Sequence, residues 1–483
     1  MSSLKKQIIR GVIWTLIQSI GSKGLSFVFL LLLAKLLSPD DFGLVGMLMI
    51  FIQISETIIE GGFNLALLQK KNIDDIDYSS VFWINFFGSI LLYIIIFLCA
   101  PLIAKFYEQE ILTSLVRIVS IVIIINSFCL IQETKLIKEI NFKVLTLAHL
   151  PSIIISGVIG ILMALKGWGV WSLVIYQILS RFTYAIQIWF RSKWKPLIII
   201  DFSRVKTLFS FGINILISNI LHVFYINSFN VILGRFYQPK VVGYYQNSFN
   251  ITSVPSATLT GVLSKVIFPT FSTIQDDNAK MKLGYQKVMQ HAFFWITPLY
   301  VFAGILAQPL FEFLFNPSWL PSVPYFKWLC VVAIFSPLVT YNLTIINVKG
   351  KSKLFLKLEV FRKLLTIVGM ISVMKIGIMA MLFVRALSEL ISYLFFAHYG
   401  GRLINYETIE QLKDLVKTSI ICFLSGIVVY LTYLFLLNEV DNLLMLIITS
   451  LLGFISYFFL AFITKNDVII EFKFILSKII KNN

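Results

Sequence analysis

A stripe of polar side chains runs along one apolar segment of this chain. Gln53, Glu56, Glu60 and Asn64 are spaced by three, four and four residues, which places all four on one face of a helix. Carboxylates and amides in this arrangement can bind a cation or hydrogen-bond a polar solute. Because a carboxylate facing lipid is costly, the stripe is predicted to face a water-filled cavity. The alternative is a set of interhelical hydrogen bonds that only hold helices together.

Neutral hydrogen-bonding side chains lie in two later apolar segments. Residues 207–233 contain Asn219, His222 and Asn230, and residues 241–268 contain Asn247 and Asn250. Amides and imidazole suit the hydroxyl groups of a sugar. His222 is also a candidate for proton coupling, although a lone histidine more often serves only as a hydrogen-bonding group.

Three cations inside apolar segments complete the candidate site. Lys23 and Glu56 lie at similar depth in the first two segments, so we expect them to pair or to share a cavity. Arg117 and Arg181 suit a bidentate grip on a pyrophosphate, or a structural role between helices. The predicted substrate cavity comprises Lys23, Gln53, Glu56, Glu60, Asn64, Arg117, Arg181, Asn219, His222, Asn230, Asn247 and Asn250.

No pattern in the sequence indicates catalysis. Asp75 and Asp77 form an Asp-x-Asp pair, but Asp77 directly precedes an apolar segment and is predicted to be its helix N-cap. The sequence has no glycine-rich phosphate loop, catalytic triad or metal-ligand cluster. We therefore expect a protein that is not an enzyme and that needs no metal or cofactor. Coupling to a Na⁺ or H⁺ gradient through Glu56 or Glu60 is a hypothesis.

The amino-acid composition indicates which class of protein contains these candidate residues. Of 483 residues, 58% are hydrophobic and 13% are charged, which is too little polar material for a soluble globule of this size. The prediction is an all-α polytopic membrane protein with about fourteen transmembrane helices. The spans are placed at 11–36, 42–69, 79–105, 111–133, 144–165, 169–190, 207–233, 241–268, 288–308, 325–348, 354–376, 378–398, 416–437 and 443–464.

The net charge of +17 reports topology rather than a nucleic-acid partner, which we do not expect. Of the 41 Lys and Arg residues, 27 fall on the side of both termini and 7 on the opposite side. Cytoplasmic loops carry the excess of cations in membrane proteins. Both termini are therefore predicted to be cytoplasmic.

A repeated turn indicates that the chain is duplicated. Lys35, Pro39 and Gly43 recur 200 residues later as Arg235, Pro239 and Gly243, each time between two apolar runs. Six spans separate the copies, so both turns face the same side and the repeats are parallel. We predict an N-lobe of six helices at 1–200, a C-lobe of six helices at 201–400, and two extra helices with a cytoplasmic tail at 401–483.

Several segments resemble the polysaccharide transporter family, the lipid-linked oligosaccharide repeat-unit flippases. These segments cluster at turns and helix ends. They are Leu68–Asn72, Asp77–Asn85, Ala100–Tyr107, Gly167–Leu173, Ser210–Gly212, Leu233–Phe236, Val242–Tyr245 and Leu263–Pro269. The similarity is close over roughly residues 1–280 and looser beyond.

The resemblance implies membership of the multidrug/oligosaccharidyl-lipid/polysaccharide exporter superfamily. It implies a partner, an undecaprenyl-pyrophosphate-linked glycan, which would be flipped by alternating access from the cytoplasmic to the outer leaflet of a bacterial plasma (inner) membrane. That step would serve lipopolysaccharide, capsule or exopolysaccharide biosynthesis. The further implied partners are membrane lipids and polysaccharide polymerase or ligase machinery. The alternatives are a cation-coupled drug antiporter, a lipid II flippase, and a membrane-embedded polysaccharide polymerase or ligase.

Overall fold

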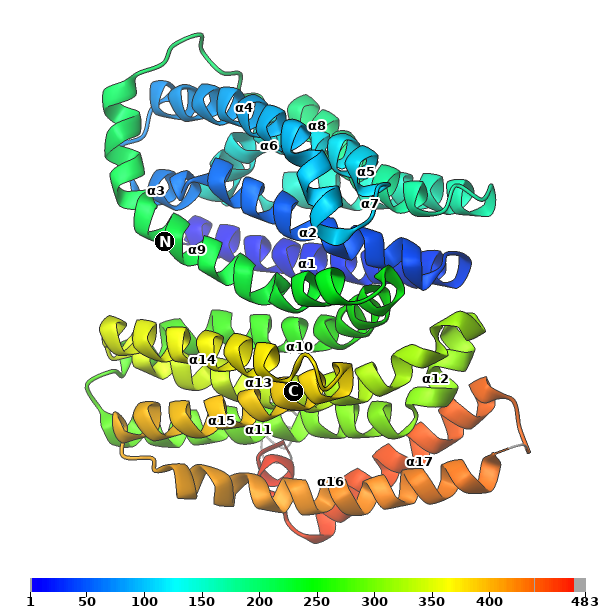
Figure 1. The fold of residues 1–483 in the computed structure, drawn as a ribbon. Coiled ribbons are helices and arrows are strands. Elements are labelled where there is room, and N and C mark those ends of the chain that lie inside the picture. The colour runs from blue at the N-terminus through cyan, green and yellow to red at the C-terminus, as the bar shows by residue number, and fades with distance from the viewer. Residues whose placement is uncertain (1, 438, 473–483) are drawn as a thin grey trace. The chain divides into compact units, whose positions relative to one another are not determined.

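Helices make up every regular element in the part of the chain that the structure describes, residues 2–437 and 439–472 of a computed structural model (Figure 1). The predicted all-α fold is thereby confirmed. The elements are α1 (Ser2–Leu36), α2 (Pro39–Glu60), α3 (Phe63–Gln69), α4 (Asp75–Tyr107), α5 (Leu112–Val119), α6 (Ile121–Lys138), α7 (Phe142–Leu165), α8 (Val170–Arg191), α9 (Phe202–Phe236), α10 (Pro239–Thr273), α11 (Asn278–Ile305), α12 (Ala307–Leu314), the 3-10 helix η1 (Pro317–Ser322), α13 (Val323–Val348), α14 (Ser352–Val373), α15 (Ile378–Arg402), α16 (Thr408–Leu436) and α17 (Asn442–Ile463).

Ten helical segments within the described residues are long and apolar enough to cross a membrane. Each of the fourteen predicted spans coincides with helical residues. The spans predicted in α1, α8, α10 and α14 are not among the ten. The protein is therefore a multi-span membrane protein, and the count of fourteen stays a prediction.

The chain divides into two compact units, Met1–Gln246 and Asn247–Asn483. Helices α1 to α9 and the first turns of α10 belong to the first unit. Within it, α9 packs along α2 and α3. The predicted lobe boundary near residue 200 lies before α9 and stays a prediction.

The two copies of the duplicated turn contact each other inside the first unit. Ser38 caps α2 through a reciprocal capping box with Asp41, and Pro39 takes the first helical position. A Cβ atom at Gly43 would lie 1.8 Å from the Pro239 carbonyl oxygen, and one at Gly243 would lie 1.9 Å from the Pro39 carbonyl oxygen. Only glycine fits at either position, so the two turns meet backbone to backbone.

A second glycine contact lies at the opposite end of α2. The predicted span 42–69 is broken there into α2 and α3, because Gly61 and Gly62 adopt positive φ angles of 52° and 72°. A Cβ atom at Gly62 would lie 2.4 Å from the carbonyl oxygen of Gly212 on α9. Glycine contacts with α10 and with α9 thus lie at the two ends of α2.

Candidate functional site

The polar stripe on α2 hydrogen-bonds to two neighbouring helices. Asn227 on α9 donates to the Gln53 side chain at 2.9 Å. Asn126 on α6 donates to Glu56. Further along α6, Thr134 donates at 2.8 Å to Asn64, which lies on α3 beyond the break at Gly61-Gly62 and not on α2 as predicted. Part of the stripe therefore makes the interhelical hydrogen bonds that the sequence offered as the alternative to a cavity.

Charged side chains from three helices gather beside the stripe. Arg181 on α8 lies within electrostatic range of Glu56 and Glu60 on α2 and of Glu133 on α6. Tyr184, one turn along from Arg181, hydrogen-bonds to Glu133. One guanidinium is thus within electrostatic range of three carboxylates, an arrangement that can hold a cation or exchange carboxylate partners for an anionic ligand.

Sequence reasoning missed Glu133 and Asn126, although both carry a recognisable signal. Glu133 stands at the end of the predicted span 111–133, and Asn126 lies seven residues, two helical turns, before it on the same face. A carboxylate and an amide within one apolar span mark a polar stripe by the same argument as the one on α2.

The predicted pair between Lys23 and Glu56 is not formed in this structure. Helix α1 packs against α7, which leaves the Lys23 side chain exposed, while Glu56 takes its partners from α6 and α8. Arg117 on α5 contacts α4 instead: its guanidinium lies 4.4 Å from the centre of the Phe97 ring and donates to the Phe97 carbonyl oxygen at 3.3 Å.

The amide-rich set is divided between the two units. In the first unit, Asn219 and His222 are exposed on α9, and Asn230 is buried and donates to Gln246 at 2.6 Å. In the second unit, Asn247 is fully buried, and its side-chain amide has no hydrogen-bond partner among the described residues. Asn250 is half-buried.

An apolar cavity of about 550 Å³ lies between α2, α4 and α9 of the first unit. Its walls include Ile58, Leu91 and Phe209, and two polar side chains, Asn85 and Lys206, also line it. The buried amide nitrogen of Asn85 has no hydrogen-bond partner in the described part of the chain. The cavity suits a hydrocarbon chain that carries a polar group at one end.

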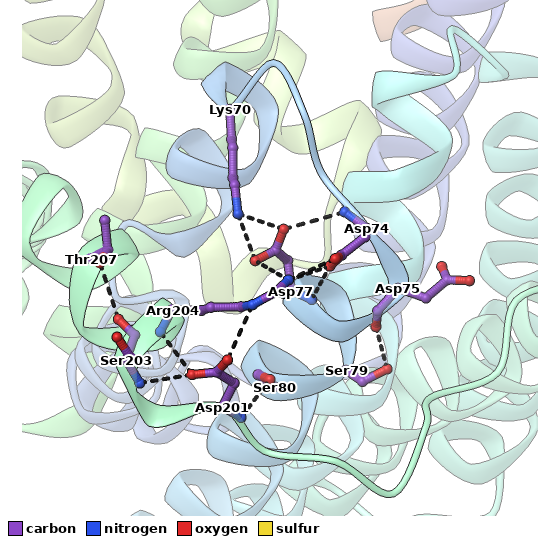
Figure 2. Close-up of polar contacts among 10 residues, drawn as sticks. All are labelled: Lys70, Asp74, Asp75, Asp77, Ser79, Ser80, Asp201, Ser203, Arg204 and Thr207. Atoms are coloured by element: carbon purple, nitrogen blue, oxygen red, sulfur yellow. Dashed lines mark hydrogen bonds and ion pairs between the residues drawn. The ribbon is translucent and has the colours of Figure 1, made fainter.

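An ionic cluster joins the ends of α3, α4 and α9 (Figure 2). Lys70 at the end of α3 contacts both carboxylate oxygens of Asp77, at 2.6 and 2.7 Å. Arg204 on α9 binds Asp74 at 2.7 Å and also contacts Asp77 and Asp201, at 3.5 and 3.1 Å. Because the Asp77 side chain is only 1% exposed, these two cations take the place of water around its carboxylate.

The same cluster corrects the predicted N-cap. The cap of α4 is Asp74, and Asp77 is the third helical residue of a reciprocal capping box. The hydrogen bond from Arg204 lowers the pKa of Asp74 to about 2, assisted by the backbone N–H of Asp77. Asp77 of the Asp-x-Asp pair is therefore part of a structural brace, and Asp75 pairs separately with Lys135 at 3.2 Å.

Comparison with known proteins agrees with the resemblance. The profile of the polysaccharide biosynthesis protein family matches residues 32–324. The teichuronic acid biosynthesis protein TuaB of Bacillus subtilis is 25% identical over 357 residues, which cover 73% of this chain and 74% of TuaB. The lipopolysaccharide biosynthesis protein WzxC of Escherichia coli is 22% identical over 76% of this chain and 75% of its own length.

Solved structures share the fold. The lipid II flippase MurJ in an inward closed conformation aligns with a TM-score of 0.79 and 17% identity, over 95% of this chain and all of MurJ. An inward-facing multidrug resistance transporter of the MATE family aligns with a TM-score of 0.62 and 14% identity, over 81% of this chain and 98% of its own. The chain thus has the fold of the multidrug/oligosaccharidyl-lipid/polysaccharide superfamily, and with its family profile matched over more than half its length it belongs to the polysaccharide biosynthesis protein family of multi-span membrane transporters.

Proposed function

We propose that this protein flips an oligosaccharide repeat unit, linked to undecaprenyl pyrophosphate, from the cytoplasmic to the outer leaflet of the bacterial inner membrane. The observation that carries the proposal is the polar network of α2, α6 and α8, in which Arg181 lies within electrostatic range of three carboxylates in an apolar bundle. Family membership supplies the class of substrate, since TuaB and WzxC are named for polysaccharide biosynthesis.

The network supports a substrate site in which different residues bind the pyrophosphate, the sugars and the lipid. Arg181 is the cation suited to the pyrophosphate, because a guanidinium binds phosphate oxygens in pairs. Amides such as Gln53 and Asn227, which bond to each other at 2.9 Å, would exchange that bond for sugar hydroxyls. The apolar cavity between α2, α4 and α9 would hold part of the lipid tail.

Alternating access accounts for the glycine contacts at the two ends of α2. Backbone contact at Gly43 and Gly243 seals one end, and contact at Gly62 and Gly212 seals the other. Flipping would require each contact to open in turn while the other stays closed. Glycine suits such contacts because it lets two backbones approach closely. Backbones that touch without side chains between them can separate without moving a packed side chain.

We further propose that a Na⁺ or H⁺ gradient drives the cycle through Glu56 or Glu60. In vesicles with a lipid-linked substrate, an imposed gradient of the coupling ion should raise the flipping rate, and Glu56→Gln should abolish that response. Glu110→Gln, in the exposed turn between α4 and α5, is the matched control. Flipping that ignores both gradients would contradict coupling but leave the flippase proposal standing.

A depletion experiment tests the flippase proposal itself. Cells depleted of the protein should accumulate the lipid-linked repeat unit on the cytoplasmic leaflet, scored by accessibility to a membrane-impermeant glycan-modifying reagent. Wild-type protein and Glu110→Gln should clear the accumulated lipid, whereas Arg181→Ala should not. If no lipid-linked unit accumulates, the proposal is wrong.

The same experiment separates the alternative functions. Accumulation of lipid II would indicate a lipid II flippase, and drug sensitivity without lipid accumulation would indicate a drug antiporter. Unpolymerised units on the outer leaflet would indicate a polymerase or ligase. We also propose that both termini are cytoplasmic and that polymerase or ligase machinery receives the flipped unit.

A further inference from the structure

An apolar groove with cations at one end lies between α6 and α8 of the first unit, apart from the polar network. Its volume is about 780 Å³, within the size range of ligand sites. The walls include Phe128, Phe182, Ile186 and Trp189, and Lys193 and Lys195 also line it. Among the described residues that line it, none is acidic.

The two lysines lie on a non-helical strap that follows α8. Residues 192–197 have no helical structure, and exposure alternates along the strap: Trp194 is buried between exposed Lys193 and Lys195. Lys193 and Lys195 on either side of the buried Trp194 both line the groove.

Contacts with α4 fix the strap in place. The Trp194 ring packs 6.1 Å from the rings of both Tyr78 and Phe82. Further along, the backbone N–H of Leu197 donates to Ser79 at 2.9 Å, and the Trp83 indole donates to the Leu197 carbonyl oxygen at 2.7 Å. The segment that carries Lys193 and Lys195 is thus fixed by the contacts of Trp194 and Leu197 with α4.

The surroundings of the groove place it at the boundary between hydrocarbon and water. Phe190 at the end of α8 is 87% exposed, and Ile198 on the strap is 93% exposed. Exposed apolar side chains beside lysines are typical of protein surfaces that sit at the level of lipid headgroups.

We propose that this groove binds a phospholipid with an anionic headgroup, whose acyl chain lies against Phe182 and Ile186 and whose phosphate contacts Lys193 and Lys195. Charge complementarity selects this occupant: apolar walls accept any lipid chain, whereas two cations without a lining carboxylate favour a negative headgroup. The site is distinct from the substrate network, and the inference does not depend on the flippase proposal.

Quenching of Trp189 measures occupancy directly. Purified protein in detergent is titrated with phosphatidylglycerol or phosphatidylcholine carrying brominated chains, and the signal that Trp189→Phe removes is assigned to the groove. Phosphatidylglycerol should quench this signal at a lower concentration than phosphatidylcholine. The double variant Lys193→Gln/Lys195→Gln should weaken the phosphatidylglycerol response roughly 30-fold, from about 1 kcal/mol for each cation.

A second lysine pair provides the matched control. Lys351 and Lys353 have the same spacing and are exposed at the start of α14, so replacing both by glutamine should leave the titration unchanged. All four lysines are exposed, and a thermal melt of each variant checks folding. Equal quenching by the two lipids, or an unchanged response in the Lys193/Lys195 variant, would overturn the proposal. Displacement by undecaprenyl phosphate but not by unlabelled phosphatidylglycerol would overturn it too, by assigning the groove to the carrier lipid.

Discussion

Replacing Gly43 by alanine is expected to force the two duplicated turns apart. The added Cβ would lie 1.8 Å from the Pro239 carbonyl oxygen, against 3.4 Å for ordinary contact, a deficit of 1.6 Å. The obstacle is backbone, so no side chain can rotate away. Overpacking of this kind costs about 1–3 kcal/mol, and that penalty would fall only on the state in which the turns touch.

The same free energy predicts how far the conformational equilibrium moves. A penalty of about 1–3 kcal/mol on the closed contact raises the population of the separated state by roughly 5- to 150-fold. Gly243→Ala should act alike, because its Cβ would meet the Pro39 carbonyl oxygen at 1.9 Å. The free-energy change in the double variant should be smaller than the sum of the changes in the two single variants, since both substitutions disrupt the same contact.

Thiol labelling reports the opening. Met47 is fully buried one turn along α2 from Gly43, so Met47→Cys should react with a maleimide only when the turns separate. In a background with the four native cysteines replaced, Gly43→Ala should raise the labelling rate by the factor given above.

Gly24→Ala is the control for the labelling experiment, because a Cβ there has no atom within 4 Å. A folded Gly43→Ala protein that labels at the control rate would refute the reasoning.

Three further predictions concern charged residues. Lys70→Ala should destabilise the protein by about 1–3 kcal/mol in a thermal melt, because the buried Asp77 carboxylate then keeps Arg204, at 3.5 Å, as its one cation contact besides the Asp74 backbone N–H. An unchanged melting temperature would show that Arg204 suffices. The pKa of Asp74, lowered to about 2 by Arg204, gives stability that is present above about pH 4 and lost as the pH falls through 2. The melting temperatures of wild type and Arg204→Gln should therefore converge at pH 2, and a constant gap would exclude Asp74 as the cause. Arg181→Ala should lower both stability and flipping, and adding Glu133→Gln should restore stability alone if Arg181 grips the substrate; recovery of flipping would assign Arg181 a structural role.

Local patterns were enough to predict much of the fold. Apolar runs of sufficient length identify membrane helices whatever their neighbours, because each helix satisfies its own backbone hydrogen bonds in the bilayer. The spacing of Gln53, Glu56 and Glu60 places these three residues on one face of α2, as predicted, whereas the break at Gly61-Gly62 puts Asn64 on α3. The Gly61-Gly62 pair was a signal for the break between α2 and α3 that the span prediction passed over.

Only the tertiary structure decided which helices are neighbours. Depth along the spans suggested Lys23 as the partner of Glu56, but α1 packs on α7, so Glu56 meets Asn126 and Arg181 instead. Equal depth in a membrane does not imply adjacency, because helix order around a bundle depends on packing between faces far apart in sequence.

The duplicated turns illustrate the same division. The sequence by itself determined that Lys/Arg, proline and glycine recur at an interval of 200 residues, since a repeat is visible in one dimension. Tertiary structure decided that Gly43 and Gly243 touch each other's turns backbone to backbone. A contact across 200 residues depends on how whole helices pack, and no local preference of either turn specifies it.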